Sequence, residues 1–144
     1  MTVLNKGIKQ ELYKEIINDF QNSPLVKLLG FNMLEIGNGI VVIEFQPRKE
    51  VLNTLGILHG GVSATLCDTA MGFSVKSLGK ISTTVEMKVN YLYPINLGER
   101  VRACGKVIKV GENICVAEGE IINEINKVAV KSLGTYFILK KYGN

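Results

Sequence analysis

The sequence is poor in the residues from which metal sites are usually built. It has one histidine, and its three cysteines, Cys67, Cys104 and Cys115, are odd in number and form no Cys-x-x-Cys pair. Isolated cysteines of this kind are typical of small buried side chains in a reducing compartment. Because no cysteine stands near the single histidine, the chain offers too few ligands for zinc. We therefore predict that the protein holds no metal.

The chain also lacks the segments that direct proteins to membranes or nucleic acid. No apolar run approaches the roughly 18 residues that span a bilayer, and residues 1–22 mix charges where a signal peptide would be apolar. The net charge is +4, but no basic cluster is longer than Lys140-Lys141, whereas nucleic-acid binding needs a basic patch. We expect a cytoplasmic protein that binds neither membrane nor nucleic acid. The positive surplus suits a polyanionic small ligand or solubility alone.

The length of 144 residues and the hydrophobic pattern predict one domain with an α+β fold. Residues 7–20 have helical spacing, and Ser23-Pro24 starts a short helix that ends near Gly30. A long helix is expected from Gly60 to about Leu78. Strands are expected at 31–36, 40–46, 82–93, 101–110, 113–123 and 128–139. About six mainly antiparallel strands would then form a curved sheet around one long central helix.

The strand predicted at 82–93 alternates cleanly between two faces, and Pro94 ends it. One face carries Thr83, Val85, Met87, Val89, Tyr91 and Tyr93. The other face carries Thr84, Glu86, Lys88 and Asn90. A regular strand would therefore place Thr84 opposite to Met87 and Tyr91.

The segment from Leu58 to Ala70 carries the residues that point to chemistry. It contains the only histidine, His59, followed by Gly60 and Gly61 at the start of the long helix. The N–H groups at a helix start have no intrahelical acceptor, so they can polarise a carbonyl, hold an oxyanion or bind a phosphate. The two glycines are also what a tight strand-to-helix turn requires.

Asp68 is the only carboxylate between residues 60 and 75, in an otherwise apolar helix. Its helical neighbours Ala64 and Gly72 are small, which leaves a groove over the carboxylate. Burying an unpaired carboxylate is costly. Asp68 is therefore either a general base or nucleophile, or a residue that pairs with a lysine or a strand hydroxyl and only orients the helix.

Gly60 and Asp68 are too far apart to act on one carbonyl within one chain. They stand eight residues apart in one helix, which is roughly 12 Å along the helix axis. If they cooperate, two copies of the helix must lie antiparallel, as in a two-fold homodimer with two equivalent composite sites.

The ordered motif resembles the PaaI-like hotdog-fold acyl-CoA thioesterases. The residues that carry the resemblance are Asn53-x5-His59-Gly60-Gly61-x6-Asp68-x-Ala70, Thr84-x-Glu86-x3-Asn90-Tyr91-Leu92-x-Pro94 and Gly134-Thr135. The resemblance covers residues 30–139 and implies a hotdog fold, in which a sheet wraps a long helix. It also implies pairing into a homodimer with a joint sheet, and further into a homotetramer. Residues 1–30 would be an N-terminal helical extension that packs on a hotdog domain at 31–144.

The resemblance implies that the protein hydrolyses an acyl-CoA thioester to a carboxylic acid and coenzyme A, with no cofactor besides the coenzyme A of the substrate. The Gly60 N–H would polarise the carbonyl with help from Asn53, and His59 would hold Asn53 and the helix start. Asp68 of the opposite subunit would activate water or attack directly, and Thr84 would help orient that water. Expected substrate-binding residues are Gly61, Met71, Gly72 and Val75, with Tyr91 and Tyr93 as further candidates.

Purely structural roles stay open for three motif residues. Asn53 could cap a turn, His59 could be a structural histidine and Thr84 could be an ordinary strand residue. The alternative to an enzyme is a non-catalytic acyl-CoA-binding sensor, but residues 1–30 offer too little for a helix-turn-helix. A purely structural dimer leaves Asp68 without a role. The acyl preference, and the choice between water activation and a covalent anhydride, are left open.

Overall fold

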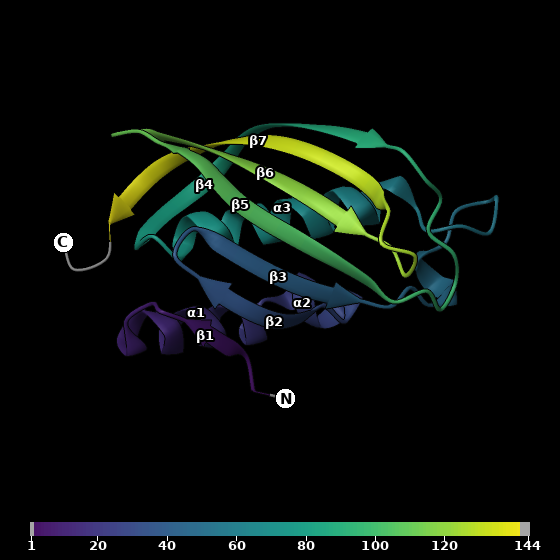
Figure 1. Cartoon of the computed structure of the whole chain (residues 1–144), viewed down its shortest axis with the longest axis horizontal. Helices are drawn as coiled ribbons and strands as arrows, with labels where there is room; N and C mark the ends of the chain where they lie inside the picture. Colours follow the sequence, from purple (N-terminus) through teal and green to yellow (C-terminus); the bar gives the residue numbers. More distant parts are fainter. Residues whose placement is uncertain (1, 142–144) are drawn as a thin grey trace.

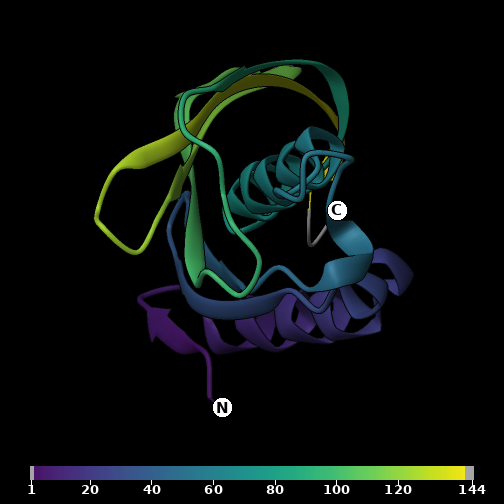
Figure 2. The same cartoon turned by 90° about the vertical axis from the view of Figure 1, so that its right-hand side faces the viewer.

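The computed structural model describes residues 2–141 and arranges them as a curved seven-stranded sheet around one long helix (Figures 1 and 2). The strand order is β1-β2-β3-β5-β6-β7-β4, and every neighbouring pair is antiparallel except β1 with β2. The strands are β1 (Leu4–Lys6), β2 (Asn32–Gly37), β3 (Ile40–Phe45), β4 (Lys80–Tyr91), β5 (Val101–Val110), β6 (Ile114–Ile122) and β7 (Val128–Lys141). The helices are α1 (Gln10–Asn22), α2 (Pro24–Leu29), the 3-10 turn η1 (Lys49–Val51) and the central α3 (Gly60–Lys76). The predicted α+β arrangement is confirmed.

The central helix α3 lies very close to the sheet. Five of its hydrophobic side chains are completely buried, namely Leu66, Cys67, Ala70, Met71 and Val75. At Gly105 of β5, a Cβ atom would lie only 2.2 Å from the carbonyl oxygen of Ala70. Because only glycine leaves room for this approach, β5 and α3 can pack backbone against backbone.

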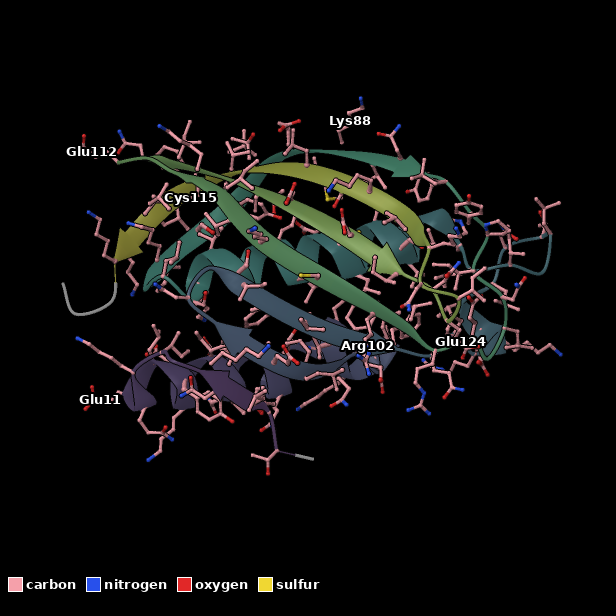
Figure 3. All side chains as sticks on the ribbon, viewed as in Figure 1. Glu11, Lys88, Arg102, Glu112, Cys115 and Glu124 are labelled. Carbon is pink, nitrogen blue, oxygen red and sulfur yellow. The ribbon has the colours of Figure 1, made fainter. Side chains whose placement is uncertain are left out.

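The edge strand β4 contains a β-bulge that the alternation of its sequence does not reveal. Thr84 pairs with Tyr136 and Glu86 pairs with Thr135, so Val85 is an extra residue. The bulge reverses the faces beyond it. Thr84 contacts Asp68 of α3, and Met87 packs against the same core, whereas Lys88 points away from α3 (Figure 3). The expectation that Thr84 and Met87 lie on opposite faces is therefore wrong.

The N-terminal helices α1 and α2 lie on the side of the molecule that carries β2 and β3 (Figure 2). Ser23 caps α2 by accepting a hydrogen bond from the Val26 N–H, and Arg48 donates to the carbonyl oxygens of Leu28 and Leu29 at its other end. From α1, Phe20 packs edge-on against Phe73 of α3 at 5.3 Å between ring centroids. Residues 2–30 thus contact the rest of the chain, but the division of the chain into an N-terminal extension at 1–30 and a domain at 31–144 stays a prediction.

Within residues 2–141, no helix is long and apolar enough to cross a membrane.

Candidate active site

The start of α3 leaves one backbone donor open. His59 is the N-cap, and its Nδ1 accepts the Gly61 N–H at 2.8 Å. The N–H groups of Val62 and Ser63 donate to the His59 carbonyl oxygen at 2.9 and 3.2 Å. Among the described residues, no acceptor takes the Gly60 N–H. Since a helix start also carries positive potential, this N–H can bind a carbonyl oxygen that develops negative charge.

Tyr91 of β4 covers the same helix start. Its hydroxyl donates to the Gly60 carbonyl oxygen at 2.8 Å, and a Cβ at position 60 would lie 3.2 Å from its ring. Glycine at this position therefore lets Tyr91 lie against the helix. Gly60 opens into a groove of about 330 Å³. The lining of this groove, here called the Gly60 groove, includes Asn53, Gly60, Ser63, Tyr91, Tyr93 and Pro94.

Asn53 and His59 each hold backbone rather than each other. The Asn53 Oδ1 accepts the N–H groups of Leu55 and Ile57 at 2.9 and 3.3 Å, which fixes the loop before α3. His59 caps the helix start as expected, but no hydrogen bond joins it to Asn53 in the part of the chain that the structure describes. The expected contact between the two is therefore not found, although Asn53 and Gly60 do line one groove.

Asp68 accepts two hydroxyl hydrogen bonds on one carboxylate oxygen. Tyr136 of β7 donates to Oδ1 at 2.7 Å, and Thr84 of β4 donates to the same atom at 2.8 Å. Thr84 and Tyr136 are directly paired across the two strands. Asp68 thus pairs with strand hydroxyls, as one of the two interpretations of the sequence predicts, and it does so with two of them. No donor of residues 2–141 is bonded to Oδ2.

The two other titratable groups beside Asp68 stay protonated near neutral pH. Burial, followed by the Asp68 charge, raises the pKa of Tyr136 well above its usual value. Burial also raises the pKa of the Cys67 thiol to about 11. Because a thiolate is the nucleophilic form of cysteine, Cys67 does not supply a nucleophile here. Asp68 is left as the group that can accept a proton.

A second groove, of about 340 Å³, opens beside Asp68. Its lining, which we call the Asp68 groove, includes Leu25 of α2, Asp68, Gly72 and Phe73 of α3, and Ile81 and Thr84 of β4. Gly72 lies where the sequence predicted. Gly60 lines only the other groove, so Gly60 and Asp68 of one chain lie in separate grooves.

Met71 and Val75, two of the expected substrate-binding residues, do not line the Asp68 groove. Both side chains are 0% exposed and belong to the hydrophobic core. Met71 faces the sheet, where its side chain lies close to Gly119 and Gly134. The helix is apolar nearly all round, so the sequence could not tell the core face from the groove face, and this expectation is corrected. Gly61 is exposed, with its N–H held by His59.

Sequence reasoning missed Tyr136 and Leu25, which lie far along the chain from Asp68. Tyr136 had a usable signal. Gly134 stands two residues before it on the same face of β7, and a Cβ at Gly134 would lie 2.9 Å from the Tyr136 ring. A glycine two residues before an inward-facing tyrosine in the last strand indicates that the tyrosine ring occupies the space of the missing side chain.

Within residues 2–141, no cluster of His, Cys, Asp and Glu could hold a metal ion.

Comparison with known proteins identifies the family and agrees with the fold. The family model described as the thioesterase superfamily matches residues 55–130. Human acyl-coenzyme A thioesterase 13 is 29% identical over 101 residues, covering 68% of this chain and 72% of that protein.

Two solved structures are also similar. The E. coli PaaI structure superposes with a TM-score of 0.88 at 21% identity, covering 94% of this chain and 98% of that one, which shows a common fold. A hypothetical thioesterase protein from Streptococcus pneumoniae, solved with coenzyme A, has a TM-score of 0.75 at 29% identity, and the match covers 77% of this chain and 90% of that one. The chain belongs to the thioesterase superfamily, as a PaaI-like thioester hydrolase with the hotdog fold.

Proposed function

We propose that the protein hydrolyses the thioester of a small or medium acyl-CoA, aromatic or aliphatic, to the free acid and coenzyme A. The single observation that carries this proposal is the pair of half-sites on α3. An open Gly60 N–H lines one groove, and a carboxylate held by two hydroxyls lines another. These groups are a hydrogen-bond donor for a carbonyl oxygen and a base, and each lacks its complement within one chain.

The half-sites would be completed in a homodimer. The strand β4 is at the edge of the sheet, so the whole length of Lys80–Tyr91 has one unpaired side. Val85, Tyr91, Leu92 and Tyr93, on and just after this edge, are exposed. Two such edges pairing antiparallel about a two-fold axis would extend the sheet and set the α3 helices antiparallel. Gly60 of one protomer would then face the partner subunit's Asp68.

The reaction follows from the chemistry of the groups. The Gly60 N–H, with the Asn53 amide in the same groove, would stabilise the negative charge that builds on the thioester oxygen. Asp68 Oδ2 would either take a proton from the attacking water or attack the carbonyl carbon to form an anhydride that water then hydrolyses. In both routes the C–S bond breaks and coenzyme A leaves as its thiol after protonation. Coenzyme A is part of the substrate, so no further cofactor is proposed.

The acyl group would lie in the Asp68 groove. Leu25, Phe73 and Ile81 give this groove apolar walls next to the carboxylate. An apolar acyl chain gains free energy on such walls, whereas the amides and phosphates of coenzyme A need polar partners or water.

Similar proteins support the assignment of Asp68 and Thr84. The S. pneumoniae thioesterase has been solved as two alanine variants, one at an aspartate and one at a threonine. Those two residues stand sixteen apart in that protein, as Asp68 and Thr84 do in this one.

A homotetramer, which the family resemblance implies, would need a second contact surface. The outer face of the sheet offers exposed apolar side chains at Ile114, Leu133 and Phe137, on the paired strands β6 and β7.

The decisive experiment measures free thiol released from a panel of acyl-CoAs by the wild-type protein and by Asp68→Asn. Asparagine keeps an oxygen for the two hydroxyls but cannot accept a proton, so we expect kcat to fall by roughly 10²–10⁴-fold with thermal unfolding unchanged. Wild-type rates in Asp68→Asn would refute the role of Asp68. Binding of acyl-CoA by the wild type without any hydrolysis would favour a sensor.

Mixing two inactive variants tests whether the site crosses the interface. Gly60→Pro removes the open N–H, and proline is well tolerated at the first helical position. A heterodimer of Gly60→Pro with Asp68→Asn contains one intact composite site. Since random mixing makes half of the dimers heterodimers, each with one good site of two, about a quarter of wild-type activity should return. No recovery from a mixture that exchanges subunits would show that each site lies within one chain.

A further inference from the structure

We infer that Tyr136 is a positioning residue that, together with Thr84, fixes the Asp68 carboxylate so that Oδ2 is its reactive oxygen. The inference rests on the proposed function and deepens it, because it assigns the atom that meets water or the carbonyl carbon. Nothing in the motif of the long helix points to Tyr136.

The two donors converge on one oxygen from two different strands. The Tyr136 hydroxyl is 2.7 Å and the Thr84 hydroxyl 2.8 Å from Asp68 Oδ1. A carboxylate oxygen has about two lone-pair positions for hydrogen bonds, so Oδ1 is fully used. Asp68 lines its groove, and Oδ2 is the oxygen that remains for a proton or for attack.

The ring of Tyr136 is held where this contact requires it. The side chain is only 1% exposed. Glycines stand on both sides, since Cβ atoms at Gly72 and Gly134 would lie 3.7 and 2.9 Å from opposite edges of the ring. A buried hydroxyl with a raised pKa keeps its proton, so Tyr136 acts as a donor toward Asp68 across the neutral pH range.

This arrangement holds the Asp68 side chain in one orientation. Two hydroxyl hydrogen bonds on Oδ1 restrict rotation of the carboxylate, so Oδ2 also keeps one position. The other titratable groups around the site are few. Cys67 is a buried neutral thiol, Lys76 is paired with Asp19, and Lys80 lines the same groove. Removal of the Tyr136 hydroxyl should therefore leave the carboxylate held by Thr84 alone.

The test compares Tyr136→Phe with Tyr13→Phe. Tyr13 is a matched control because its hydroxyl also donates one short hydrogen bond, to the Val3 carbonyl oxygen at 2.6 Å, away from the grooves. Phenylalanine keeps the ring that lines the groove, so KM should change less than about three-fold. We expect kcat of Tyr136→Phe to fall by roughly ten- to a hundred-fold because the carboxylate loses its orientation. The loss should therefore fall on kcat rather than on KM. Tyr13→Phe should change none of these.

The division of the loss between kcat and KM separates positioning from simple support of the fold. A fall in kcat with an equal rise in KM, or wild-type kinetics in Tyr136→Phe, overturns the inference. If Tyr136→Phe does not fold, Thr84→Val removes the second donor at an exposed position and should likewise lower kcat without raising KM. An unchanged kcat in that variant overturns the two-donor arrangement. Failure of the proposed function itself looks different, because the wild type would then release no thiol or Asp68→Asn would remain active.

Discussion

Two glycines, one in the strand beside the central helix and one in the helix itself, should respond to the same substitution with opposite signs. At Gly105 of β5, a new Cβ would lie 2.2 Å from the Ala70 carbonyl oxygen and 2.6 Å from the Met71 nitrogen. These atoms belong to the backbone of α3 and cannot rotate away. At Gly72 of α3, a new Cβ would meet one atom, Tyr136 Cε1, at 3.7 Å, which is an ordinary contact.

The magnitudes follow from these distances. To relieve the contact at Gly105→Ala, α3 must retreat from β5 by about 1 Å, which weakens the packing of the buried side chains around it. Overpacking against backbone should cost at least about 3 kcal/mol. Gly72→Ala instead removes a flexible residue from a helix interior and should add about 0.5–1 kcal/mol.

Thermal unfolding followed by far-ultraviolet circular dichroism measures both effects. For a chain of this length, Tm should fall by about 10 °C in Gly105→Ala and rise by a few degrees in Gly72→Ala. Wild-type protein and the two variants are compared in one buffer at one concentration, since association also shifts Tm. If Gly105→Ala unfolds within about 2 °C of the wild type, or if both variants shift in the same direction, the close approach of α3 to the sheet is refuted.

Two further predictions concern the groove and the buried thiol. Leu25→Ala should raise kcat/KM for longer acyl groups several-fold relative to short ones, because Leu25 lines the Asp68 groove. Leu28→Ala on the same helix is the control and should leave this ratio unchanged. Leu25 and Leu28 are 48% and 66% exposed, but only Leu25 lines the groove. Identical acyl-length profiles would refute the placement of the acyl group. Because burial raises the pKa of Cys67 to about 11, the thiol stays protonated at pH 8, and mass spectrometry should find it alkylated only after unfolding; rapid alkylation in the native protein would contradict its burial.

The sequence was sufficient for the elements whose patterns are long and regular. The strand predicted at 101–110 is β5 itself, and the turn chemistry of Ser23-Pro24 and Gly30 marks both ends of α2. The three residues of β1 are too few to show alternation. This strand exists because it pairs in parallel with β2, and such a contact leaves no local pattern.

The candidate site was predictable only where it is local. Gly60, His59 and Asp68 lie in one helix and its cap, so spacing alone indicated two half-sites. Tyr136 reaches Asp68 only because β7 pairs with β4 in the register that sets Thr84 opposite Tyr136. Such a register depends on the sheet as a whole and cannot be derived from either strand.

The bulge at Val85 affects both the fold and the candidate site. Thr84 donates to Asp68 and Tyr91 donates to the Gly60 carbonyl oxygen, so one strand must turn both side chains toward α3. The two residues are an odd number of positions apart, and a regular strand would place them on opposite faces. One extra residue between them restores the common face, and bulges often occur beside active sites for this reason. The edge strand can therefore serve both half-sites only because it departs from its own alternation.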